Sequence, residues 1–235
     1  MTNPAIQRPA PAPDTIQIWS DLLCPFAYVA IHRLMAARDR HGLADRVQID
    51  HHSFPLELFN GPHPRPGTDS EAVGLGQIEP DAQFRLWTGP EWDYPSTVLL
   101  AAEAVLASKE QGLNVSADFD LALRRAFWTS SRSIGHRQVI LEVAGEVDGL
   151  DVAALTEALD TGRHRAELMS DFAISKTDEV QGSPHLFLPD GFGVNNPGIS
   201  VHWQGPWAEG FPVVDSHDSD WIDEIFQRLG VGATV

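Results

Sequence analysis

The residue best suited to chemistry is the single cysteine of this 235-residue chain, Cys24, which directly precedes Pro25. An alternating apolar run over residues 15–20 comes before it, and an amphipathic stretch ending near residue 42 follows. Proline suits the first position of a helix, because its missing N–H would have no partner there. Cys24 is therefore expected at a helix N-cap, where free amides and the helix dipole favour a thiolate. We expect its pKa to be lowered.

Two observations limit this interpretation. Free cysteine is often a buried small apolar residue, and a structural role is the alternative for Cys24. Ala27 occupies the place of the second cysteine of a C-x-x-C motif. The chain therefore cannot close an internal disulfide, and we predict a site with one cysteine.

A second candidate feature lies near the end of the chain, where Ser183 and Pro184 precede an apolar segment. Proline after a small residue favours a cis peptide bond, although a trans proline is commoner at the start of a strand. We predict a cis Ser183–Pro184 bond. His185 is the histidine best placed to stabilise a thiolate, with a core position as its alternative. Tyr28 and Trp128 could line an apolar slot beside the sulfur or pack in the core.

The pattern of apolar residues predicts the elements that must position these groups. Residues 15–54 have a strand–helix–strand pattern, with the helix at 25–41, and residues 180–230 contain strands and a final helix. Residues 1–14 are expected to form a flexible arm, and residues 55–179 an insertion. The insertion is expected to be irregular over 55–90, with one short helix near 82–87, and then helical. The remaining predicted helices are 95–112, 117–129, 136–147, 152–159 and 163–178, with a last helix that starts near 216–219 and ends at 229. The remaining predicted strands are 185–188, 199–203 and 211–214.

Composition narrows the function classes. The 33 acidic and 16 basic residues give a formal charge of -17, which argues against a nucleic acid partner. We see no apolar run long enough for a membrane span, no secretory signal and no metal-binding spacing, and we expect no metal site. One cysteine requires no oxidising compartment, so a cytoplasmic location is expected.

Together these features resemble the DsbA-like branch of the thioredoxin fold. More narrowly, they are similar to FrnE-type dithiol isomerases, 2-hydroxychromene-2-carboxylate isomerases and kappa-class glutathione transferases. The resemblance implies an α/β, thioredoxin-like fold with a helical insertion domain. It rests on five motifs: residues 21–28 around Cys24, residues 54–57, the helix beginning at residues 95–97, residues 126–128 followed by Ile134 and Gly135, and the Gly182-Ser183-Pro184 turn.

The resemblance implies a thiol–disulfide oxidoreductase, here limited to one thiol. Cys24, beside Pro25, would attack a disulfide, and an external thiol would release the product. Kappa-class enzymes place serine at the position of Cys24, so a transferase or isomerase that depends on a low-molecular-weight thiol is an alternative. Residues 195–214 do not match their tripeptide-binding segment. A non-catalytic binding module is a third interpretation.

The expected partner is a thiol or disulfide, either a small molecule or a protein, and a homodimer is left open. No tightly bound cofactor is expected, only a low-molecular-weight thiol as co-substrate. The resemblance also places Pro184 within van der Waals reach of the Cys24 sulfur. The substrate-binding residues that it implies are Phe26, Ala27, Tyr28, Trp128, Ser183, Pro184 and His185.

Overall fold

The structure, a computed structural model, describes residues 7–206 and 209–231. Its central sheet has the strand order β2-β1-β3-β4. Strand β1 (Thr15–Ser20) is parallel to β2 (Gln48–Ser53) and antiparallel to β3 (His185–Phe187), which pairs antiparallel with β4 (Gly193–Asn195). Helix α1 (Pro25–Arg40) connects β1 to β2. The α/β fold and its β-α-β opening are confirmed.

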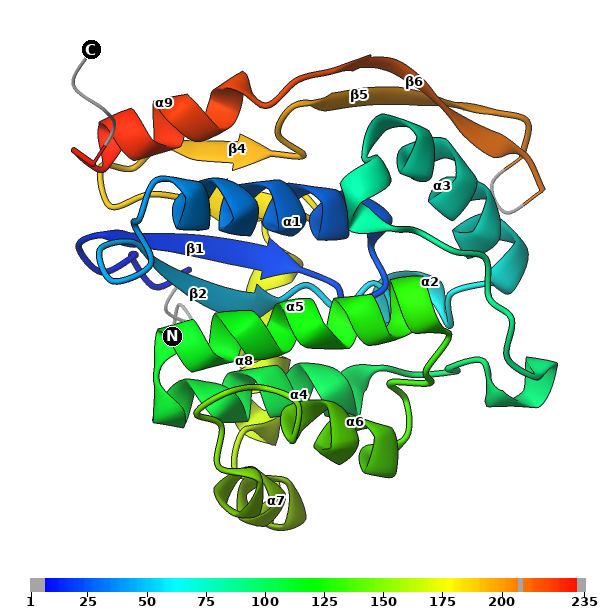
Figure 1. The fold of residues 1–235 in the computed structure, drawn as a ribbon, viewed down its shortest axis with the longest axis horizontal. Coiled ribbons are helices and arrows are strands. Elements are labelled where there is room, and N and C mark those ends of the chain that lie inside the picture. Colours follow the sequence, from blue (N-terminus) through cyan, green and yellow to red (C-terminus); the bar gives the residue numbers. More distant parts are fainter. Residues whose placement is uncertain (1–6, 207–208, 232–235) are drawn as a thin grey trace, which may run out of the picture.

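The helical insertion separates β2 from β3 along the chain and contacts the edge strand β2. In Figure 1 the helical part lies below the sheet, whereas α1 and the last helix lie above it. The helices of this part are α4 (Leu99–Ser108), α5 (Leu113–Ser130), α6 (Arg137–Ala144), α7 (Val152–Thr161) and α8 (Arg165–Ser175), and the last helix is α9 (Asp220–Arg228).

Alternating residues of β1 enter two apolar clusters, because neighbouring side chains of a strand point to opposite faces. Ile16 and Ile18 belong to the large cluster that includes α1, α5 and α9. Trp19 packs instead with Phe187 of β3 and Ile174 of α8. Both faces of the strand that leads to Cys24 are therefore buried, which fixes the position from which α1 begins.

The segment that follows β2 differs from its prediction. It contains a short helix, α2 (Glu57–Asn60), and a full helix, α3 (Arg65–Ile78), whereas the helix expected near 82–87 is absent from the described chain. Three glycines in α3 weaken its sequence pattern. At Gly74 an added Cβ would lie 3.2 Å from Pro212, and at Gly76 3.3 Å from Phe84. These glycines therefore permit close packing, which local helix propensity does not reveal.

The C-terminal strands also differ in part. Strands β5 (Ile199–Gln204) and β6 (Phe211–His217) form a separate antiparallel pair, and β6 packs against α3. Strand β4 was not predicted. The predicted helices of the insertion are present; α4, α6 and α8 are shorter than predicted, and α5 and α7 are longer. Asp151 caps α7 by accepting hydrogen bonds from the N–H groups of Ala153 and Ala154.

Part of the expected N-terminal arm, residues 1–6, lies outside the described residues. From Arg8 on, the segment is attached to the domain rather than loose. The Arg8 guanidinium donates to Gln17 Oε1 at 2.7 Å and lies over the ring of Phe187. Within residues 7–206 and 209–231, no helix is long and apolar enough to cross a membrane.

Candidate active site

Cys24 occupies the N-cap of α1, as predicted, with extended backbone angles (φ -82°, ψ 113°), and Pro25 follows in the first turn. Its thiol is buried, with 4% of the residue exposed. The Sγ–H group donates to the backbone carbonyl of Ser183, at 3.1 Å. Two segments 159 residues apart therefore meet at the sulfur.

The segment facing the thiol is the predicted proline turn. The Ser183–Pro184 peptide bond is cis, which confirms that prediction. The backbone N–H of Asp21 donates to Ser183 Oγ at 2.9 Å, so this turn is fastened to both ends of the link between β1 and α1. Pro184 itself is buried.

A cavity of about 220 Å³ opens beside the sulfur. Four of the predicted site residues line it: Cys24, Pro25, Phe26 and Ser183. The rest of the wall comes from the segment after β2 and from α3, and consists of Leu56, Asn60, Gly61, His63 and Glu71 together with Leu23. Ala27, Tyr28, Trp128, Pro184 and His185 are not among the lining residues.

Two aromatic residues proposed for an apolar slot belong to the core. The Tyr28 hydroxyl donates to the carbonyl of Ala82 at 2.7 Å, and the Trp128 indole donates to the carbonyl of Leu22 at 3.3 Å. Both side chains are buried, as is Ala27. Trp128 therefore supports the turn before Cys24 from behind and is not part of the cavity wall.

His185 also has no direct role at the sulfur. Its Nδ1 accepts a hydrogen bond from the Gln181 backbone N–H, and its ring lies 4.1 Å from that of Phe187. Burial, aided by the positive charge of Arg8, lowers the pKa of His185 to about 4. The ring is neutral at neutral pH and supplies no positive charge to a thiolate, which favours the core alternative.

The expected lowering of the Cys24 pKa is wrong in sign. Burial raises the pKa of the thiol to about 12, and the carboxylates of Glu71 and Asp21 act in the same direction. Hydrogen bonding with Ser183 and the backbone of Ala27 acts in the opposite direction. The helix N-terminus thus has the predicted effect, but desolvation of the anion is larger.

Sequence reasoning missed the polar residues of the cavity that come from outside the Cys24 and Pro184 segments. They lie near Asp21 of the Cys24 segment, which accepts hydrogen bonds from the backbone N–H groups of Leu23 and Leu56, at 2.7 and 2.8 Å. His63 Nε2 lies 3.5 Å from Asp21 Oδ1. Glu71 comes from α3, the helix that the sequence did not reveal. A tertiary contact, and no local motif, brings His63 and Glu71 to the sulfur.

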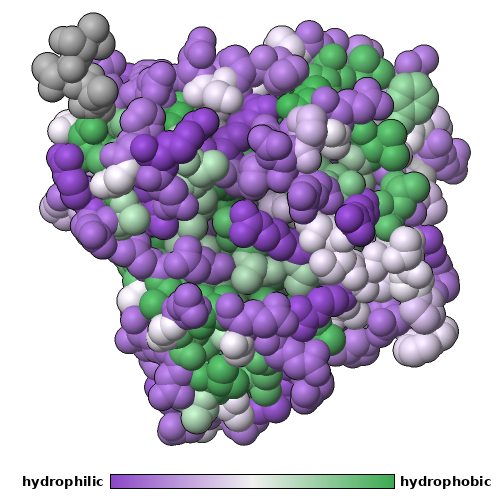
Figure 2. Space-filling model, viewed as in Figure 1, coloured by the Kyte–Doolittle hydropathy of each residue, from purple (hydrophilic) through white to green (hydrophobic). Residues whose placement is uncertain are grey.

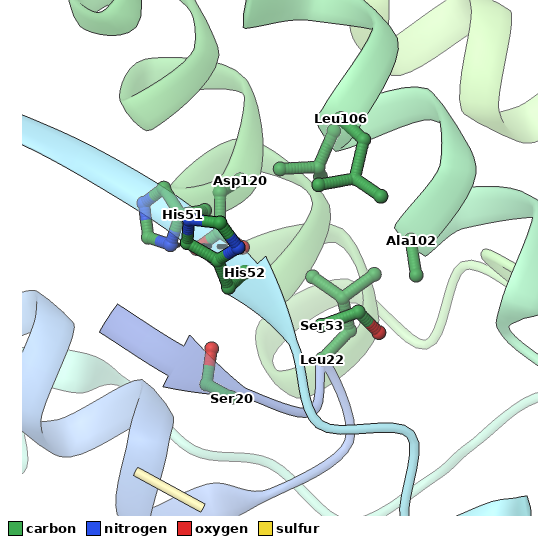
Figure 3. Close-up of a pocket in the computed structure, with 9 residues that line it drawn as sticks. Ser20, Leu22, His51, His52, Ser53, Ala102, Leu106 and Asp120 are labelled. Carbon is green, nitrogen blue, oxygen red and sulfur yellow. Dashed lines mark ion pairs between the residues drawn. The ribbon is translucent and has the colours of Figure 1, made fainter. Parts of the chain in front are cut away.

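A second buried polar cluster lies under the turn before Cys24. Arg124 of α5 donates to Asp120 Oδ2, to the Asp21 carbonyl and to Ser20 Oγ, each at 2.7 Å. Figure 3 shows Asp120 beside His51 of β2, and the two side chains are 3.8 Å apart. The helical insertion therefore holds the end of β1, and with it the position of the thiol.

A larger groove, of about 660 Å³, lies between α3 and β6 and contains none of the predicted site residues. Val73 and Phe211 are about half exposed along it, at 51% and 50%. Figure 2 shows apolar surface over this part of the molecule. In the part of the chain that the structure describes, no three side chains of His, Cys, Asp or Glu are placed to hold a metal ion.

A helical domain between β2 and β3 separates one branch of thioredoxin-fold proteins from the rest, and this molecule has the architecture of that branch. The chain belongs to the DsbA-like thioredoxin domain family, whose model matches residues 15–200. A search of curated proteins finds no match.

Solved structures share the fold at low sequence identity. A probable DsbA oxidoreductase from Streptomyces coelicolor is 18% identical with a TM-score of 0.65, covering 94% of this chain and 92% of its own. The cytosolic disulfide reductase DsbM from Pseudomonas aeruginosa, solved with GSH, is 16% identical with a TM-score of 0.53, covering 92% and 99%. A 2-hydroxychromene-2-carboxylate isomerase is 17% identical with a TM-score of 0.51, covering 75% and 86%.

Proposed function

We propose that this chain catalyses thiol–disulfide exchange through Cys24 alone, with a small disulfide and a small thiol as its two substrates. The observation that carries the proposal is the position of the sulfur, at the N-terminus of α1, on the wall of a cavity and 3.1 Å from the Ser183 carbonyl. The cavity, at about 220 Å³, is smaller than most ligand pockets, which favours one arm of a small disulfide over a folded protein.

The reaction has two exchanges. In the first, the Cys24 thiol loses its proton, the sulfur attacks one sulfur of R–S–S–R, and the old disulfide bond breaks. This leaves Cys24–S–S–R and releases R–SH after the leaving thiolate takes up a proton. In the second, a small thiol R′–SH attacks the mixed disulfide, which restores the Cys24 thiol and releases R–S–S–R′. No second cysteine exists in the chain to do this internally.

The raised pKa of Cys24 sets a condition on the proposal. Compared with the ordinary value of 9.0, a pKa of about 12 reduces the thiolate fraction at neutral pH roughly a thousandfold. The exchange therefore requires a proton acceptor in the cavity.

The same neutral thiol favours one second candidate. Because an S–H group donates a hydrogen bond, Cys24 could hold the thiolate of a bound small thiol without forming a covalent bond. The protein would then act as a thiol-dependent transferase or isomerase. DsbM, a disulfide reductase, and the isomerase share the fold, so fold alone does not choose between the two chemistries.

Exposure of the full chain to oxidised glutathione, followed by intact mass spectrometry, tests the proposal. We expect one glutathione adduct per chain, reversed by a small thiol, and none in Cys24→Ser. The serine variant keeps the shape of the site and removes the sulfur. An unmodified wild-type chain after exposure at pH 8 would contradict the exchange chemistry.

A further inference from the structure

Glu71 is an unexplained ionisable group in the cavity. It lies on α3, half-buried, and lines the same cavity as the Cys24 sulfur. In the described part of the chain its carboxyl group forms no hydrogen bond and no ion pair. A carboxylate that faces a cavity without a partner is costly as a structural feature, because its desolvation is not offset.

We propose that Glu71 accepts the proton of the Cys24 thiol, so that the thiolate forms only as it attacks a disulfide. This inference rests on the proposed exchange function and names the group that would make it work. The cavity of about 220 Å³ is large enough to hold water between the carboxyl and the sulfur, so the proton has a path.

The electrostatics of the cavity suit this role. Burial raises the pKa of Glu71 to about 7, and the positive charge of His63 opposes that shift. A proton acceptor is most effective when its pKa lies near the working pH, since it is then both ionised and sufficiently basic. An ordinary surface glutamate, with a lower pKa, would accept a thiol proton less readily.

The groups that act on Glu71 come from several segments around the cavity. His63 is held near Asp21, and Asp21, Glu71 and Glu57 together raise the pKa of its ring although burial opposes them. Burial raises the pKa of the Tyr94 hydroxyl, and the negative charge of Glu71 acts in the same direction. His63 is therefore a positioning residue, because it sets the protonation of Glu71 and does not itself take the proton.

The proton and the electrons balance within the proposed exchange. The Glu71 carboxylate takes the proton from Sγ as the Cys24 sulfur attacks R–S–S–R. A new S–S bond forms between Cys24 Sγ and one sulfur of the disulfide, and the S–S bond of R–S–S–R breaks. The carboxylic acid then returns the proton to the leaving R–S⁻, so Glu71 is unchanged after each exchange.

Alkylation of the folded full chain by iodoacetamide tests the inference without any exchange assay, because Cys24 is the only thiol. In the wild type we expect the rate to rise with an apparent pKa near 7, before a second rise at high pH. Glu71→Gln should remove the first rise and slow alkylation at pH 8 by about tenfold or more. Asp81→Asn, an exposed change of the same charge outside the cavity, should leave the profile unchanged.

A purely electrostatic effect of Glu71 would change the alkylation rate in the opposite direction. If Glu71 were only a negative neighbour, its removal would lower the Cys24 pKa and speed alkylation at every pH. That result would overturn the inference. Since the test uses no disulfide, a missing glutathione adduct together with the predicted alkylation profile would refute the exchange function and leave the proton transfer standing.

A second variant covers the case in which Glu71→Gln does not fold. His63→Gln removes the positive charge that lowers the Glu71 pKa, so the first rise in the alkylation profile should shift to higher pH. An unshifted rise, or a rise that disappears in His63→Gln, would overturn the inference. Disappearance would assign the proton transfer to the imidazole instead.

Discussion

Replacement of Arg124 by methionine should lower the free energy of unfolding by about 3–5 kcal/mol. The guanidinium is buried and pairs with Asp120, whose carboxylate would be left in the core without a cation. The Asp21 carbonyl and Ser20 Oγ would each lose a 2.7 Å hydrogen bond as well. The change should appear as a lower midpoint of urea unfolding.

The neighbouring Arg125 provides the matched control. It lies on the same helix but is exposed, so Arg125→Met should change stability by only about 0.5 kcal/mol. A double variant that also replaces Asp120 with leucine should recover part of the loss, because it removes the unpaired charge. A loss below about 1 kcal/mol in Arg124→Met would mean that the insertion does not hold the turn through this cluster.

Stability should fall on acidification between about pH 6.5 and 4, with His51 contributing about 3 kcal/mol to the loss. Burial lowers the pKa of His51 from 6.5 to about 4 in the folded protein, although Asp120 opposes the shift. In this window the unfolded chain binds the proton and the folded chain does not. Stability from this group is therefore complete above the unfolded pKa and is lost as the pH falls.

The variant His51→Leu should flatten this acid slope, measured as unfolding free energy against pH. Its neighbour His52 is a control of opposite sign. Burial lowers the pKa of His52, but hydrogen bonds to Asp171 and Asp50 outweigh burial and raise it. His52 thus contributes stability at low pH that is lost as the pH rises through its folded pKa, so His52→Gln should steepen the acid loss. His185 acts in the direction of His51. An unchanged slope in His51→Leu would contradict the burial of a neutral ring.

The sequence predicted the parts of the site that depend on local chemistry. Cys24 and Pro25 mark a helix start whatever surrounds them, and Ser183 and Pro184 form a turn before a strand. These two segments were placed together only through the family resemblance. The structure brings them to a hydrogen bond of 3.1 Å.

The parts that the sequence did not reveal depend on tertiary packing. Residues 65–78 form a helix whose glycines fit against Pro212 and Phe84, although the same glycines weaken helix propensity. Glu71 of this helix therefore could not be placed at the sulfur. The predicted direction of the Cys24 pKa shift was wrong for a related reason, because the burial that raises this pKa is a property of the whole fold.

The central claim is that Cys24 forms a covalent intermediate with one substrate before the other reacts. Steady-state kinetics with hydroxyethyl disulfide and glutathione as probes test it most directly. We predict ping-pong kinetics, with parallel lines in double-reciprocal plots, and no catalysed rate in Cys24→Ser. Intersecting lines, or a serine variant that keeps its activity, would contradict a covalent exchange and favour a thiol held without a bond.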